Sequence, residues 1–253
     1  MTGHVIAMIV FICVSAGALG GVALRARVPD HDLDTDLREG IKLVLGLVST
    51  VTAMVLSLLV TSSNSLLATQ DSEVQQLSAE VVELDRRLAV YGPETKEIRA
   101  MLREVVAAEI QRLWHPDGAA DANLPQTPAA LEGDDVYVKI LALTPQSDAQ
   151  RFGQSRALQA LTEMAHIRLL MHEQASEALP WPFLAVLVFW LFALFAGFGL
   201  VSRANAMGVT TLFVGALIVA GAMFLIVDMR HGYTGLIQVS SAPLKSAMEQ
   251  IGR

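Results

Sequence analysis

Four long runs without a charged side chain constrain the fold more than any other feature of this sequence. They cover residues 5–24, 43–70, 179–202 and 204–227. Each can supply the helix of about 20 residues that crosses a bilayer core. Only 17% of all residues are charged, against about a quarter in soluble domains. The sequence therefore predicts a membrane protein with four transmembrane helices. A signal peptide begins with a positively charged segment, and no Lys or Arg precedes the first run. We therefore interpret this run as a retained helix.

The chain between the second and third runs is long enough to form a water-soluble domain. Residues 64–179 contain 10 Lys and Arg against 18 Asp and Glu, a net charge of −8. A surface of this sign repels nucleic acid. The predicted organisation is transmembrane helices 1 and 2 with a short acidic connection (1–63), an acidic helical soluble domain (64–179), transmembrane helices 3 and 4 (180–228) and an amphipathic C-terminal tail (229–253).

The soluble domain shows helical periodicity and no alternating strand pattern. Apolar residues follow a heptad pattern at Val74, Leu77, Val81, Leu84, Leu88 and Tyr91. No helix breaker precedes them, so we expect the second membrane helix to continue to Tyr91 and to end at Gly92-Pro93. Further helices are expected at about 94–114 and from Thr144-Pro145 to 178, with a loop at 115–135. The predicted fold is thus an all-α membrane protein with four transmembrane helices and a helical, partly coiled-coil soluble insertion between helices 2 and 3.

The heptad pattern allows two arrangements. Leu77, Val81, Leu84 and Leu88 are candidates for a seam between copies of the chain, which would make it a homo-oligomer. They can equally pack on the helices expected at 94–114 and 145–178 of the same chain.

The second membrane run has one face of small and polar residues, which recur every three or four positions. These residues are Gly46, Thr50, Ala53, Ser57, Thr61 and Asn64. Such a face is typical of close packing between membrane helices, and it can also line a pore shared by symmetric copies. On the pore interpretation, Thr50, Ser57, Thr61 and Asn64 are the candidate lining residues. The interiors of all four runs lack ionisable residues, which argues against proton-coupled carriers and ion pumps.

No pattern in the sequence indicates catalysis, a cofactor or a metal site. The six histidines include no pair spaced four residues apart and no H-E-x-x-H, and Cys13 is the only cysteine. No G-x-S-x-G, P-loop or dinucleotide fingerprint occurs. We therefore predict that the protein is not an enzyme.

The positive-inside rule gives an expected orientation. Five basic residues lie in the short connections (Arg25, Arg27, Arg38, Lys42 and Arg203) and three at the termini (Arg230, Lys245 and Arg253). We expect a multi-pass protein of the bacterial inner (cytoplasmic) membrane with its helical domain outside the cytoplasm.

Four stretches resemble the bacterial bestrophin-like domain proteins, a family of membrane proteins of unknown function that is remotely related to bestrophin channels. They are LDRRLAVYGPETKEIRAMLR (84–103), LTPQSDAQRF (143–152), FLAVLVFWLFALFAGFGLVSRANA (183–206) and GLIQVSSAPLKSAMEQIG (235–252). True bestrophins are homopentameric anion channels whose second membrane helix lines a neck with bulky apolar and aromatic residues. The second run here contains no Phe, Tyr or Trp.

The resemblance implies a homo-oligomeric ion channel with the second helix along the pore. The alternative is a non-catalytic, membrane-anchored structural or interaction protein whose helical domain docks a protein partner. The bilayer is the expected environment in both cases.

Overall fold

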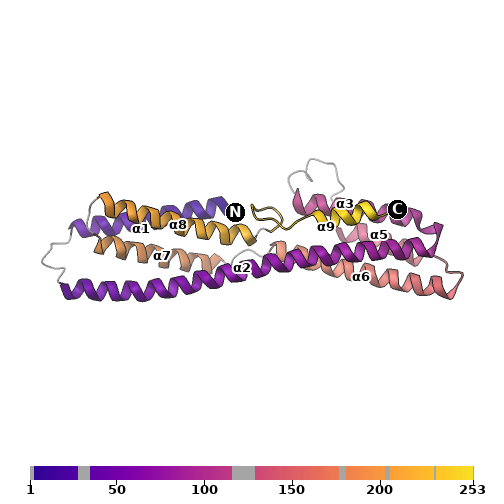
Figure 1. Ribbon diagram of the computed structural model, residues 1–253, viewed down its shortest axis with the longest axis horizontal. Helices are drawn as coiled ribbons and strands as arrows, with labels where there is room; N and C mark the ends of the chain where they lie inside the picture. The colour runs from indigo at the N-terminus through magenta and orange to yellow at the C-terminus, as the bar shows by residue number, and fades with distance from the viewer. Residues whose placement is uncertain are drawn as a thin grey trace. The chain divides into compact units, whose positions relative to one another are not determined.

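The computed structural model describes residues 3–27, 35–115, 129–176, 181–202, 206–230 and 232–252. Every regular element in these ranges is a helix, which confirms the predicted all-helical class for the described residues. The chain divides into two compact units (Figure 1). The first, here called the membrane unit, comprises residues 1–66 and 178–230, and the second, the helical unit, comprises residues 67–177 and 231–253. Residues 28–34 of the predicted acidic connection lie outside the described residues.

Among the described residues, four helices are long and apolar enough to cross a bilayer, as predicted. They are α1 (Gly3–Arg27), the N-terminal part of α2 (Thr35–Tyr91), α7 (Trp181–Val201) and α8 (Ala206–Arg230). Helix α1 packs along both α7 and α8 in the membrane unit (Figure 1). The first and last of these helices end in basic residues, Arg27 and Arg230, which suit a helix C-terminus.

Glycines allow the backbones of α1 and α7 to come into direct contact. A Cβ atom at Gly17 would lie 2.7 Å from the carbonyl oxygen of Phe192. One at Gly21 would collide with the carbonyl oxygen of Ala196. Close contact between backbones is the usual role of a G-x-x-x-G spacing in membrane helices, where no water drives association.

Helix α2 is continuous from Thr35 to Tyr91, as the absence of a breaker predicts. Gly92 follows directly after the helix and has a φ of 145°, a backbone conformation that glycine adopts readily and that is strained for other residues. Pro93–Thr95 form one 3-10 turn, η2, which leads into α3 (Lys96–Trp114). The buried Thr95 hydroxyl donates a hydrogen bond of 2.6 Å to the Leu88 carbonyl and thereby ties the turn to the end of α2. The YGPET segment is therefore an interhelical turn.

The helical unit contains the C-terminal part of α2, α3, α5 (Ala129–Leu141), α6 (Asp148–Ser176) and α9 (Ala242–Gln250). Two boundaries differ from the prediction. Residues 129–135 begin α5 instead of extending the loop. Helix α6 starts at Asp148, and not at Thr144-Pro145, because Ser147 is its N-cap: the Ser147 hydroxyl accepts a hydrogen bond from the backbone N–H of Gln150 at 3.2 Å.

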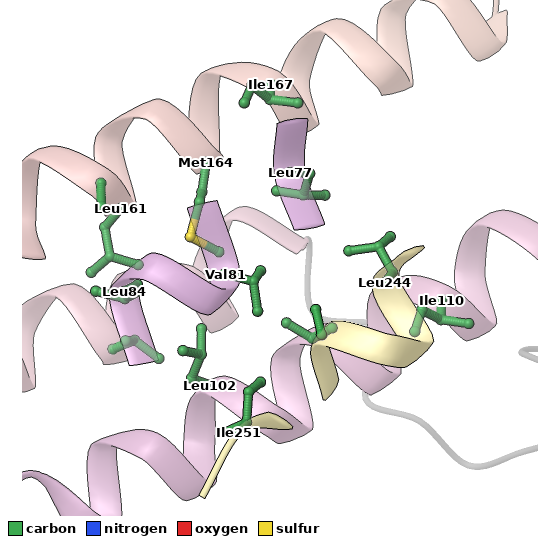
Figure 2. Close-up of a cluster of buried hydrophobic side chains, with 14 of the residues drawn as sticks. Leu77, Val81, Leu84, Leu102, Ile110, Leu161, Met164, Ile167, Leu244 and Ile251 are labelled. Atoms are coloured by element: carbon green, nitrogen blue, oxygen red, sulfur yellow. The ribbon is translucent and has the colours of Figure 1, made fainter. Parts of the chain in front are cut away.

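The C-terminal segment packs into the core of the helical unit. Figure 2 shows Leu244 beside Ile110 and Ile251 near Leu102, both on α3, and all four belong to the same buried cluster as residues of α2 and α6. Tyr233 and Val239, which precede α9, belong to the same buried cluster. Ser78 on α2 donates a hydrogen bond of 2.8 Å to the Pro243 carbonyl. The described residues 232–252 thus pack as part of the helical unit.

Candidate functional site

The small and polar face of α2 is exposed within the chain. Its residues, here called the polar face, are Gly46, Thr50, Ala53, Ser57, Thr61 and Asn64, and all six are exposed. They lie in the apolar part of α2, within the membrane unit. The described part of the chain therefore does not cover this face.

The other sides of α2 have different surroundings. Leu45, Thr52, Leu59 and Ser63 are buried and attach the helix to the membrane unit. A second exposed side is apolar, with Leu47, Val51 and Leu58 exposed to 68%, 43% and 71%. Aliphatic side chains facing outward suit contact with lipid. Hydroxyl and amide side chains that find no partner on their own helix do not, because burying an unpaired polar group in hydrocarbon is costly.

The threonine hydroxyls of the polar face have a defined hydrogen-bond geometry. Thr50 Oγ1 donates to the Gly46 carbonyl at 3.0 Å, and Thr61 Oγ1 donates to the Ser57 carbonyl at 3.0 Å. Each hydroxyl proton is thus directed at the backbone of its own helix. What these side chains present outward is an oxygen with free lone pairs, which is a hydrogen-bond acceptor and a ligand for cations.

The predicted seam residues are buried within their own chain. Leu77, Val81, Leu84 and Leu88 are each at most 2% exposed, and they form the α2 side of the helical unit's own core. Figure 2 shows the first three of them. Of the two arrangements that the heptad allows, the structure has the one within the chain. The helices α3, α6 and α9 supply the apolar partners that copies of α2 would otherwise provide.

The helical unit also buries several charged and polar groups that sequence reasoning did not identify. Glu109 is 2% exposed and accepts a hydrogen bond of 3.0 Å from the Arg168 guanidinium. Glu73 is 7% exposed and accepts one of 2.6 Å from the Gln174 amide. Burial raises the pKa of Glu73, and the hydrogen bond from Gln174 opposes this shift. Burial also raises the pKa of Tyr233, and so do the nearby charges of Glu73 and Glu109.

The sequence identifies the two glutamates of this cluster but not their partners. Glu73 and Glu109 occupy inward positions of otherwise apolar helical faces, which marks them as buried or paired. Their partners lie 101 and 59 residues away along the chain, respectively, and no short spacing identifies them. In the described residues, no group of three or more His, Cys, Asp or Glu is placed to hold a metal ion.

The fold is shared with solved structures of a bacterial bestrophin homologue from Klebsiella pneumoniae, each determined with one substitution. One matches with a TM-score of 0.68 and 14% sequence identity over 97% of both chains. The other matches with a TM-score of 0.65 and 14% identity over 96% of this chain and 97% of that one. An identity this low shows a common fold and nothing about conserved chemistry.

No curated protein matches the sequence. The sequence profile of the Bestrophin-like domain matches residues 12–244, which reach from α1 into α9. This match spans both units and most of the chain, so the protein is a member of the Bestrophin-like domain family.

Proposed function

We propose that the protein is a homo-oligomeric ion channel whose pore is lined by the polar face of α2. The observation that carries this proposal is the exposure of Thr50, Ser57, Thr61 and Asn64 on a helix that is apolar enough to cross a bilayer. A water-filled pore offers hydrogen-bond partners to the Ser57 hydroxyl and the Asn64 amide, which lipid cannot do, and it also solvates the outward oxygens of Thr50 and Thr61. The fold shared with bestrophin homologues supports the same function.

One membrane unit supplies only one side of such a pore. Several copies arranged around an axis, each turning its polar face inward, would enclose it. The oligomer contacts then come from the membrane helices and from exposed surfaces of the helical unit, since the heptad residues of α2 are used within the chain. The membrane in question is the inner membrane of a bacterium.

The chemistry of the polar face favours cations. The hydroxyls of Thr50 and Thr61 turn acceptor oxygens outward, and oxygen ligands can replace part of a cation's hydration shell. Residues 64–179 carry a net charge of −8 per copy, and a protein surface of this sign attracts cations. With no fixed charge on the face itself, we expect modest selectivity among cations.

The test is the conductance of the purified full-length protein in planar bilayers. Ser57→Trp places a ring of indoles on the polar face and is expected to abolish most of the current. Leu58→Trp is the matched control, because Leu58 is 71% exposed on the apolar side of the same helix turn, and its current should equal that of the wild type. A silent wild type, or equal currents from both variants in folded oligomers, would reject the pore.

The alternative function is docking of a protein partner by the helical unit. It is favoured by large apolar side chains that this unit leaves exposed. These are Val90, Val138, Leu141, Phe152 and Leu169, each at least 57% exposed. Copies of the chain could equally cover them. A stable heterologous complex recovered from native membranes, together with a silent protein in bilayers, would favour docking over conduction.

A further inference from the structure

A groove opens between α2, α7 and α8 inside the membrane unit. Its volume is about 670 Å³, within the range of sites that hold small molecules. The lining is apolar along most of its length, from Leu45, Phe195, Phe198, Leu212 and Gly215. Lys42 lines it as well and is the one ionisable residue among the lining residues that the structure describes.

Two hydroxyls in the groove wall have no proton free to donate to a ligand. Ser49 donates its proton to the Leu45 carbonyl at 2.7 Å, and Thr211 donates to the Met207 carbonyl at 2.9 Å. Both protons are therefore used within their own helices. Apart from the Ser49 and Thr211 oxygens, Ser202 and Lys42, the lining side chains are apolar, so the groove has few partners for water, which needs two to four polar groups to be held.

The position of the charge restricts the occupant further. Lys42 lies in the first turns of α2, just before the charge-free run begins at residue 43, so its ammonium group belongs to the membrane surface. The groove walls continue from there along residues of the charge-free runs of α7 and α8. A molecule that fits has an apolar chain for the walls and an anionic group for Lys42.

We propose that this groove binds a phospholipid, with an acyl chain between α2, α7 and α8 and an anionic headgroup at Lys42. Such a lipid fills the space that α2 leaves beside the other membrane helices and so holds α2 in place. The proposal does not depend on conduction, because the groove shares only Gly46 with the polar face and none of the four candidate pore residues.

Two variants separate the acyl and headgroup contacts. Gly215→Leu fills the groove from α8. A Cβ at this position would meet the Phe195 ring at 3.4 Å, an ordinary contact, so the packing of α8 should tolerate the substitution. Gly221→Leu is the matched control on the same helix, since nothing lies within 4 Å of a Cβ at that position. Lys42→Gln removes the charge and keeps most of the side-chain length.

The measurement is native mass spectrometry of the full-length protein, purified in detergent and given phosphatidylglycerol or phosphatidylcholine with identical acyl chains. We expect the wild type and Gly221→Leu to retain one lipid per chain, with phosphatidylglycerol preferred about tenfold. Lys42→Gln should lose that preference and keep binding, while Gly215→Leu should lose both lipids. Equal retention by Gly215→Leu and the wild type, or no retained lipid in the wild type, would overturn the proposal. So would loss of oligomers in Gly215→Leu without any change in lipid binding, because a second copy would then occupy the groove.

Discussion

Truncation of Leu84 tests whether the heptad of α2 packs within the chain. Leu84 is fully buried in the core of the helical unit. Replacing a buried leucine by alanine removes apolar contacts and leaves a cavity, at a cost of about 2–5 kcal/mol. We therefore expect Leu84→Ala to lower the free energy of unfolding of the helical unit by this amount.

The assay is hydrogen exchange of the full-length protein in detergent, followed by mass spectrometry of peptides from α3 and α6. A loss of 2–5 kcal/mol corresponds to exchange about 30 to 5,000 times faster in the best protected amides. Val90→Ala is the control on the same helix, because Val90 is 82% exposed, and its exchange should stay within about threefold of the wild type. The assignment of the core would be refuted if Leu84→Ala exchanged like the control. It would also be refuted if the effect vanished at high protein density, as expected for a seam between copies.

Two further perturbations probe packing and buried charge. Gly21→Leu should separate α1 from α7, because its side chain would meet the Ala196 carbonyl, and thermal unfolding should occur at lower temperature than in Gly20→Leu, where nothing lies within 4 Å. For Glu73, a pKa raised by burial means that the folded state holds its proton more tightly than the unfolded chain. Stability should then fall as pH rises from the ordinary pKa of 4.5 through the raised value. Glu73→Gln keeps the acceptor for Gln174 and should be more stable than the wild type at pH 8 and equal to it at pH 4, as measured by thermal unfolding at both pH values.

The membrane helices could be predicted because length and the absence of charge determine them locally. A run of 20 uncharged residues has few alternatives to a spanning helix, and α2 continues to Tyr91 because residues 47–91 contain no Gly or Pro. The polar face could likewise be recognised from its spacing. Its exposure could not, because that depends on which side of α2 the other membrane helices occupy.

The partner of the heptad could not be predicted, because the same apolar stripe serves a second copy or another helix of the chain. The apolar residues of α9 and Ile251 illustrate the same ambiguity. Leu244, Ala247 and Ile251 recur at helical spacing and indicate an amphipathic segment, but the pattern does not say which surface they cover. The predicted orientation rests on five basic residues against three, and a margin this small separates the two orientations weakly.

Accessibility of single cysteines along α2 tests the proposed pore most directly. Cys13 is the only native cysteine, and Cys13→Ser provides a background without thiols. Cysteines are then placed at Ser57 and Thr61 on the polar face, and at Val51 and Leu58 on the apolar side. A positively charged, water-soluble thiol reagent is added while the current across a planar bilayer is recorded. The account predicts that the reagent blocks the current through Ser57→Cys and Thr61→Cys and leaves Val51→Cys and Leu58→Cys unchanged. Block confined to the apolar side, or equal block at all four positions, would contradict it.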